Sequence, residues 1–216
     1  MRIKICGLTQ TNQAVEIATM GASVLGFICV KQSPRYISPD TIHTIAQALP
    51  AVDRFGVFAN ASLEQVKHTV TIGQLSGVQL HGQESINYCQ QIRTILPGVE
   101  LIKALRIRHP NDLIQVEDYG PYVDTFLLDA YHPDQLGGTG HTLNWQELQN
   151  FQPPKPWFLA GGLRPNNVAQ ALSLLTPDGI DLSSGVEHAP GDKDLAKVAQ
   201  LIHNVHIATS DRKSVV

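Results

Sequence analysis

The sequence lacks the features that mark several large classes of protein. Its 216 residues contain only three cysteines, Cys6, Cys29 and Cys89, which are widely spaced and odd in number. This pattern argues against a disulfide framework, and no Cys-x-x-Cys pair points to zinc binding or dithiol redox chemistry. The nine histidines form no His-Glu-x-x-His motif, so we expect no metal ion.

Long apolar runs and an excess of charge of one sign are also missing. No apolar segment approaches the roughly 18 residues that a membrane-spanning helix needs, and the first residues lack the pattern of a signal peptide. Charged residues make up 16% of the chain and the formal net charge is −3, so no basic field is available for nucleic acid. We therefore expect a cytoplasmic protein that binds neither membranes nor nucleic acid.

The chain does contain enough apolar sequence for a large core. Hydrophobic residues make up 43% of it, which is typical of a globular protein and argues against disorder. Continuous apolar runs are typical of parallel strands that helices cover from outside. Eight such runs are predicted strands: Ile3–Cys6, Val24–Ile28, Arg54–Phe58, Gly77–Leu80, Leu101–Leu105, Thr125–Asp129, Trp157–Ala160 and Gly179–Leu182.

Segments with a helical period separate these runs. Their predicted buried faces are Ala14, Ile17 and Ala18; Leu63, Val66 and Val70; Val168, Ala171, Leu172 and Leu175; and Leu195, Val198, Ala199 and Ile202. Ser62 with Gln65 three residues later predicts a capping box. Eight alternations of about 25 residues favour a single-domain (β/α)8 TIM barrel over residues 1–206, with a doubly wound open sheet as the alternative. Residues 207–216 show no apolar stripe, and we expect them to fray.

Two glycine-rich turns follow the last two predicted strands. One contains Gly161 and Gly162, and the other contains Ser183, Ser184 and Gly185. Backbone N–H groups in such turns, with a short helix N-terminus nearby, form a nest for anions. A single turn of this kind is an ordinary strand-to-helix connection. Two of them, at the place where this barrel usually binds phosphate, favour a phosphate site.

Cys6 ends the first predicted strand, where a barrel places its reactive residues. A small buried apolar residue is the alternative interpretation of a lone cysteine. Lys4 lies two residues earlier and so shares a strand face with Cys6. Its ammonium group can lower the pKa of the thiol and favour the thiolate, or it can pair with an interior carboxylate instead.

Three further side chains follow strand ends. Asp129 lies behind three apolar residues, where desolvation favours the protonated carboxyl and suits a general acid, although a helix-capping or loop-ordering aspartate fits equally. On spacing alone, His81 fits a loop histidine that is hydrogen-bonded to the backbone. Arg35, on a loop that Pro34 stiffens, can pair with a carboxylate, whereas a solvated surface arginine is the alternative.

Eight segments, in order from the first strand to the last, carry a resemblance to a known family. They are Lys4–Thr9, Ser33–Ile37, Phe55–Phe58, Val78–Gly82, Leu127–Asp129, Gly137–Gly140, Ala160–Leu163 and Asp181–Glu187. Together they resemble phosphoribosylanthranilate isomerase over nearly the whole chain. The resemblance implies an Amadori rearrangement without a cofactor, in which N-(5-phosphoribosyl)anthranilate, a small phosphosugar, becomes 1-(2-carboxyphenylamino)-1-deoxyribulose 5-phosphate in L-tryptophan biosynthesis.

The resemblance also implies a role for each site residue. Asp129 would protonate the furanose ring oxygen, and Cys6 would remove the proton from C2 of the sugar. Arg35 would hold the anthranilate carboxylate, and the two glycine-rich turns would hold the phosphate. His81 and Asp181 match motif positions near the barrel mouth and would support substrate binding. Because the family is often monomeric, we expect a monomer.

The chain departs from the family pattern in two places. Leu143 and Asn144 stand where the family more often has Phe and Asp, and residues 131–136 are particular to this chain. Two related barrel enzymes fit less well, because indole-glycerol-phosphate synthase needs a catalytic lysine and glutamate at strand ends and the histidine-pathway isomerase needs an aspartate in place of Cys6. A binding protein that has lost turnover is the non-catalytic alternative, and the presence of Cys6 and Asp129 counts against it.

Overall fold

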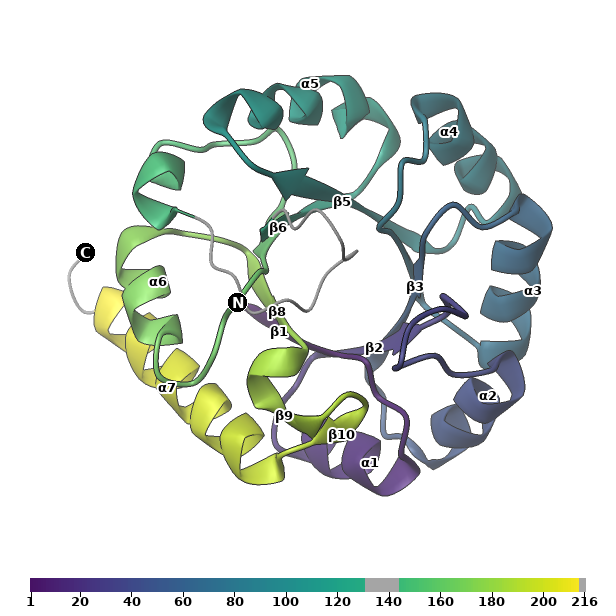
Figure 1. The fold of residues 1–216 in the computed structure, drawn as a ribbon, viewed down its shortest axis with the longest axis horizontal. Helices are drawn as coiled ribbons and strands as arrows, with labels where there is room; N and C mark the ends of the chain where they lie inside the picture. The colour runs from purple at the N-terminus through teal and green to yellow at the C-terminus, as the bar shows by residue number, and fades with distance from the viewer. Residues whose placement is uncertain (131–143, 214–216) are drawn as a thin grey trace.

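The strands of the chain form a closed cylinder. The computed structural model describes residues 1–130 and 144–213. Eight strands pair side by side in chain order, and β1 pairs in parallel with β8 to close the barrel. Figure 1, which looks along the barrel axis, shows the helices as a ring around the strands. The (β/α)8 prediction is confirmed, and the alternative of an open sheet is wrong because β1 and β8 leave no free edge.

The predicted strands agree with the observed ones to within two residues at each end. The strands are β1 (Arg2–Cys6), β2 (Val24–Ile28), β3 (Asp53–Phe58), β4 (Gly77–Leu80), β5 (Glu100–Ile107), β6 (Thr125–Ala130), β7 (Trp157–Leu159) and β8 (Gly179–Leu182), followed by a short hairpin of β9 (Glu187–Ala189) and β10 (Asp192–Lys193). The helices are α1 (Thr11–Thr19), α2 (Pro39–Ala48), α3 (Leu63–Gly73), α4 (Ile86–Ile95), α5 (Gln115–Tyr119), α6 (Val168–Leu174) and α7 (Leu195–Lys213). The 3-10 turns are η1 (Pro110–Ile114), η2 (Gly120–Tyr122), η3 (Trp145–Leu148) and η4 (Ser184–Val186).

The core has two parts because successive residues of a strand point to opposite faces. Outward-facing side chains pack against the helices, and the predicted helix faces take part; Ala14 and Ile17 of α1 are fully buried. A smaller apolar cluster fills the barrel lumen: Val24, Phe55, Ile102, Ala104, Leu127, Phe158 and Ala160. The predicted capping box is also confirmed, since Ser62 and Gln65 each accept the other's backbone N–H at the start of α3.

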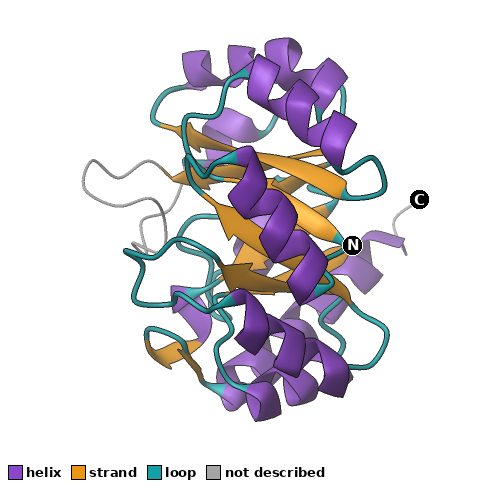
Figure 2. Ribbon diagram, turned by 90° about the vertical axis from the view of Figure 1, so that its right-hand side faces the viewer, coloured by secondary structure: helices purple, strands orange, loops and turns teal. Residues whose placement is uncertain are grey.

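An ion cluster closes the amino end of the barrel. Arg2 of β1 donates to Glu100 of β5 at 2.7 and 2.9 Å and to Asp53 of β3 at 2.8 Å. Its guanidinium carbon also lies 5.4 Å from the ring centres of Phe55 and Phe158. In the side view of Figure 2 the N-terminus lies at this end, and the β9–β10 hairpin lies at the opposite end. Space for a ligand is therefore to be sought at the carboxyl ends of the strands.

Three features of the fold differ from a regular alternation. In residues 144–156, before β7, the structure has the turn η3 instead of an α-helix. The β9–β10 hairpin was not predicted. Helix α7 continues to residue 213 and partly buries Ala208 against the core, although fraying of residues 207–216 stays a prediction. The Gly137–Gly140 motif and the departures at residues 131–136 and 143 lie outside the described residues.

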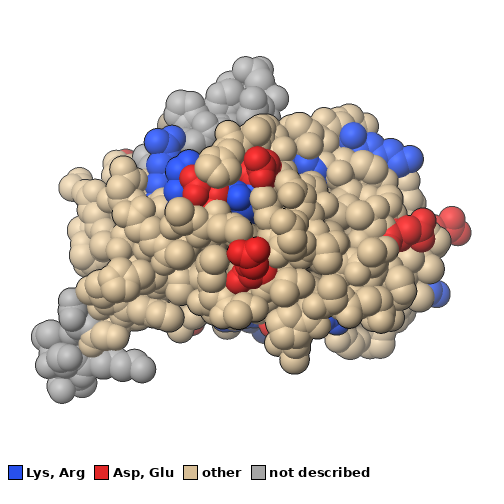
Figure 3. Space-filling model, turned by 90° about the horizontal axis from the view of Figure 1, so that it is seen from below, with Lys and Arg blue, Asp and Glu red and all other residues tan. Residues whose placement is uncertain are grey.

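Two further observations concern the length of the helices and the charge on one face. None of the helices in the described part of the chain is long and apolar enough to cross a membrane. On the face shown in Figure 3, blue and red side chains are sparse and mixed, and most of the surface belongs to uncharged residues. This distribution agrees with the low content of charged residues.

Candidate active site

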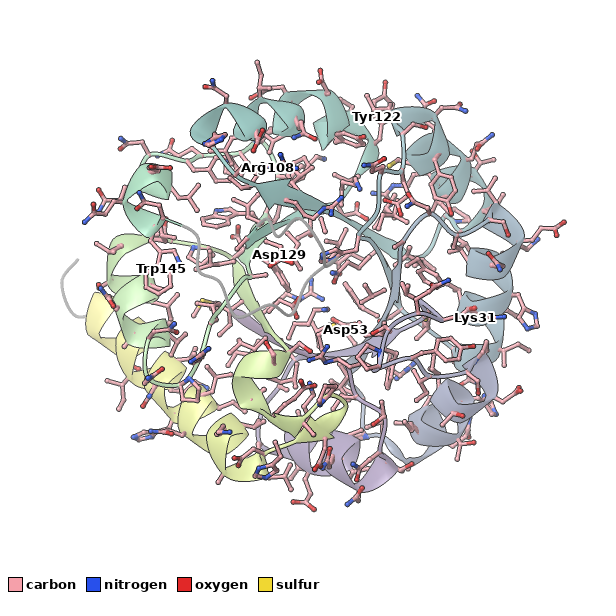
Figure 4. All side chains as sticks on the ribbon, viewed as in Figure 1. Lys31, Asp53, Arg108, Tyr122, Asp129 and Trp145 are labelled. Atoms are coloured by element: carbon pink, nitrogen blue, oxygen red, sulfur yellow. The ribbon has the colours of Figure 1, made fainter. Side chains whose placement is uncertain are left out.

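One cavity at the carboxyl ends of the strands brings the predicted site residues together. It measures about 430 Å³. Its lining includes every one of them: Cys6, Arg35, His81, Asp129, Gly161, Gly162, Asp181, Ser183, Ser184 and Gly185. Strands β7 and β8 separate β6 from β1 in the barrel wall, so Asp129 and Cys6 reach the cavity from different directions. Figure 4 shows Asp129 inside the ring of strands.

A buried ion pair lies on the same strand face as Cys6. Lys4 and Asp181 are register partners on β1 and β8, and Lys4 Nζ donates to Asp181 Oδ1 at 2.9 Å. The Lys4 side chain is fully buried and that of Asp181 is nearly so. Burial lowers the pKa of Lys4, but the charges of Asp181 and Cys6 outweigh burial and leave that pKa raised. Of the two alternatives for Lys4, pairing with an interior carboxylate is confirmed.

The Cys6 thiol is harder to ionise than an ordinary cysteine. Burial raises its pKa, and the nearby Asp181 carboxylate raises it further, while Lys4 and Lys193 lower it by less. Lys4 lowers the pKa of Cys6 as one of the two alternatives proposed, but not enough to bring it below the ordinary value, so the expected preference for the thiolate is wrong. The physical reason is first the burial of the thiol, whose desolvation cost exceeds the effect of Lys4, and then the Asp181 carboxylate, which offsets part of the charge of Lys4.

Alkylation of Cys6 tests this direction. Only the thiolate reacts with iodoacetamide, so a raised pKa predicts that the rate of Cys6 modification rises about tenfold per pH unit through pH 9 without levelling off. The rate is measured by mass spectrometry of the Cys6 peptide, with the Cys89 peptide as an internal reference; burial raises the pKa of Cys89 to about 11. A plateau below pH 8 would show that Lys4 dominates after all.

His81 and Asp129 lie next to each other in the lining of the cavity. His81 Nε2 lies 3.2 Å from Asp129 Oδ2, at an angle that does not form a hydrogen bond, so Nε2 has no partner among the described residues. On the other side of the ring, Nδ1 lies 2.8 Å from Gln79 Nε2. When the Gln79 amide donates to Nδ1, the ring proton lies on Nε2, the nitrogen nearer to Asp129, but it is not aligned with the carboxylate oxygen. The interpretation of His81 as a ring bonded to the backbone is wrong.

Arg35 is held in a buried network and is not a solvated surface side chain. Its Nε lies 2.9 and 3.1 Å from the two carboxylate oxygens of Glu187, and its Nη2 lies 2.6 Å from Oε2. Lys193 Nζ contacts the same carboxylate at 2.7 Å. Burial raises the pKa of Glu187, but Arg35 and Lys193 together hold it below its usual value. The carboxylate is therefore ionised at neutral pH.

The two glycine-rich turns touch each other at the cavity edge. Gly161 has φ +81°, and a Cβ there would lie 2.6 Å from the backbone N of Ala130. A Cβ on Gly185 would lie 1.9 Å from the carbonyl oxygen of Leu163, so only glycine permits this approach. The first N–H groups of η4 have no carbonyl partner within the turn. The buried Ser183 hydroxyl also lacks a partner among the described residues. These groups form a donor-rich wall suited to a phosphate.

Sequence reasoning missed three side chains that organise the site. Gln79 lies two residues before His81 and shares its strand face, so the period-two rule that paired Lys4 with Cys6 would have found it. Glu187 and Lys193 lie on strands of three and two residues. Such short strands carry no periodic signal, and no pattern in the sequence predicts the contacts of Glu187 with Arg35 and Lys193.

The fold and the cavity place the protein in a definite class. It is a (β/α)8-barrel enzyme with a thiol, a carboxyl group and a wall rich in hydrogen-bond donors around one cavity at the strand ends. Within the described ranges, no group of three or more His, Cys, Asp or Glu side chains is arranged to bind a metal ion.

Residues 3–204 match the family described as N-(5'phosphoribosyl)anthranilate (PRA) isomerase, and the chain belongs to this family. It is 60% identical to the N-(5'-phosphoribosyl)anthranilate isomerase of Rippkaea orientalis, over 94% of each chain. It is 57% identical to that of Acaryochloris marina, over 95% of this chain and 98% of the relative.

Solved structures of the family have the same fold. The phosphoribosyl anthranilate isomerase of Thermotoga maritima superposes with a TM-score of 0.88 at 34% identity and covers 95% of this chain and 98% of its own. The enzyme of Thermus thermophilus gives a TM-score of 0.86 at 32% identity, with 96% and 99% covered.

Proposed function

We infer that this protein converts N-(5-phosphoribosyl)anthranilate to 1-(2-carboxyphenylamino)-1-deoxyribulose 5-phosphate in L-tryptophan biosynthesis, by acid/base catalysis without a cofactor. The observation that carries the inference is that Cys6, Asp129, Arg35 and both glycine-rich turns line one cavity in a member of this family. A family member that is 33% identical, with a TM-score of 0.82, is described as a complex with reduced 1-(O-carboxyphenylamino)-1-deoxyribulose 5-phosphate.

The first step opens the sugar ring. We assign the general acid to Asp129, whose side chain is nearly buried and lines the cavity. Its carboxyl group gives a proton to the furanose oxygen as the bond from C1 to that oxygen breaks. The lone pair of the anthranilate nitrogen forms the C1=N bond, and the product is an open-chain Schiff base with a free hydroxyl. His81, beside the carboxylate, supports this end of the substrate.

The second step moves a proton from carbon. The thiolate of Cys6 takes the proton from C2, the freed electron pair forms C1=C2, and the electrons of the C1=N bond return to nitrogen. The enolamine then tautomerises as C1 gains a proton and the C2 hydroxyl loses one, so that the ketone forms and both side chains return to their starting states. Because the thiol is hard to ionise, the nearby Lys4 is needed to stabilise the thiolate.

The charged ends of the substrate hold its reacting carbons between these two groups. Arg35 binds the anthranilate carboxylate, and the turns at Gly161–Gly162 and Ser183–Gly185 bind the phosphate. Fixing both ends lowers the entropic cost of reaching the reactive geometry. Asp181, through its pair with Lys4, supports the wall near Cys6.

We further propose that the protein acts in the cytoplasm as a monomer, although a Thermotoga maritima relative is described as dimeric.

A fluorescence assay tests the activity. Freshly made phosphoribosylanthranilate is fluorescent, and purified protein is expected to quench it at a rate proportional to enzyme concentration. The control is spontaneous decay of the substrate in the same buffer. A decay rate that does not change with added protein would refute the enzymatic function and leave a binding protein.

Arg35→Ala tests the carboxylate contact. We expect it to weaken the binding of ligands that carry the anthranilate carboxylate by about tenfold or more, because a charge-assisted hydrogen bond is lost. A ligand without that carboxylate should bind nearly as it does to the unchanged protein. Calorimetric titration measures both affinities. An equal loss for the two ligands would remove Arg35 from carboxylate recognition.

A further inference from the structure

One buried carboxylate at the barrel mouth has no part in the chemistry described so far. The side chain of Glu187, the first residue of β9, is 4% exposed. Its Oε1 accepts from Arg35 Nε at 2.9 Å, from Lys193 Nζ at 2.7 Å and from the N–H of Gly191 at 3.1 Å. Its Oε2 accepts from Arg35 Nη2 at 2.6 Å and from Nε at 3.1 Å. Protein donors thus occupy both oxygens, and Glu187 is held within the wall.

This carboxylate fixes the direction in which Arg35 points. Glu187 engages Nε and Nη2, whereas Nη1 of this cavity-lining residue makes no hydrogen bond to the described residues and keeps its donors for a ligand. The stem of Arg35 packs closely over Gly7, where an added Cβ would lie 2.7 Å from Arg35 Cδ. A guanidinium held in this way loses little further freedom when it binds a carboxylate, and such preorganisation raises affinity.

Lys193 extends the same network to the base and to the phosphate wall. Its side chain is fully buried. Its Nζ donates to the backbone carbonyl of Cys6 and lies 3.4 Å from the carbonyl oxygen of Ser183. Glu187 therefore connects the carboxylate anchor, the end of β1 and the turn after β8 through one pair of oxygens.

We propose that Glu187 is a positioning residue for recognition of the aryl carboxylate of the substrate, acting through Arg35 without touching the substrate. The proposal rests on the proposed function, because it requires Arg35 to be the carboxylate anchor. It makes Glu187 a determinant of specificity, since it prepares the site for a substrate with a carboxylate at that position.

A purely electrostatic effect of Glu187 would have the opposite sign. Glu187 is negative and lies beside the guanidinium, so it opposes the approach of a second carboxylate. Removing its charge would then tighten the binding of a carboxylate ligand. If positioning dominates, removing the charge weakens that binding, because Arg35 loses the bidentate partner that holds its plane. The direction of the change therefore separates the two explanations.

The test compares two ligands by calorimetric titration. One is reduced 1-(2-carboxyphenylamino)-1-deoxyribulose 5-phosphate, and the other is the same molecule with a phenyl group in place of the carboxyphenyl group. We expect Glu187→Gln to weaken the binding of the first ligand about tenfold or more. The binding of the second ligand should weaken less than about twofold. In an Arg35→Ala background, Glu187→Gln should change neither affinity further, since residues that act as one unit are not additive.

A second variant keeps the charge. Glu187→Asp shortens the side chain by one methylene and withdraws the carboxylate from Arg35, so we expect the same selective loss for the carboxylate ligand. Circular dichroism of each variant confirms folding, and Glu187→Asp carries the test if Glu187→Gln does not fold. Tighter or unchanged binding of the carboxylate ligand, equal loss for both ligands, or additive effects with Arg35→Ala would overturn the proposal. Failure of the unchanged protein to prefer the carboxylate ligand would instead refute the part of the proposed function that makes Arg35 the carboxylate anchor.

Discussion

Asp129→Asn is expected to lower kcat by a factor of about 10² to 10⁴, the usual contribution of a positioned acid or base. Asparagine has nearly the same shape as aspartate, so the packing of β6 and the approach to His81 are preserved. It has no acidic proton to give to the ring oxygen, and ring opening then depends on water. Steady-state kinetics measure the loss.

The matched control lies at the other end of the same strand. Asp124, just before β6, is partly exposed, accepts from the N–H of Leu101 and pairs with Arg93. Residues at the amino end of a barrel contribute to stability and not to catalysis. Asp124→Asn should therefore leave kcat within about twofold. Equal losses for Asp124→Asn and Asp129→Asn would mean that the effect on Asp129 is structural.

Cys6→Ala is the second change with a large expected effect. It removes the group that takes the proton from C2, and we expect kcat to fall by about 10² to 10⁴ while the fold persists. The kcat of Cys6→Ser should fall nearly as far, because a hydroxyl is far harder to ionise than a thiol. The loss is measured as turnover of phosphoribosylanthranilate.

Cys29 provides the control for this change. It lies just after β2 and is not part of the lining of the active-site cavity, and burial raises its pKa to about 12. Cys29→Ala should keep normal turnover. Near-normal turnover of Cys6→Ala would show that the thiol is a small packing residue, the alternative interpretation that the sequence left open.

The fold could be predicted because each barrel strand has a simple local pattern. A parallel strand covered by helices reads as an apolar run, and its carboxyl end marks a place at the barrel mouth. This rule alone placed Cys6, His81, Asp129 and the two turns at one rim, and the structure confirms that they line one cavity. Local pattern was sufficient because the barrel repeats one rule eight times.

What could not be predicted depends on contacts between distant parts of the chain. Arg35 and Glu187 are 152 residues apart, and neither residue's surroundings in the sequence show that the other is near. The choice between the two alternatives for Lys4, a lowered pKa of Cys6 or a pair with a carboxylate, could not be made from the sequence for a similar reason. The direction in which the pKa of Cys6 shifts depends on how deeply the thiol is buried and on the nearby Asp181, which is paired with Lys4. Both are properties of the assembled barrel.

The central claim is that two side chains carry out two different proton transfers, and a substrate deuterated at C2 of the sugar tests it directly. In Cys6→Ala the removal of the C2 proton limits the residual rate, so deuterium should slow turnover several-fold. In Asp129→Asn ring opening is limiting, so deuterium should leave the rate nearly unchanged. An isotope effect in Asp129→Asn together with none in Cys6→Ala would contradict the assignment.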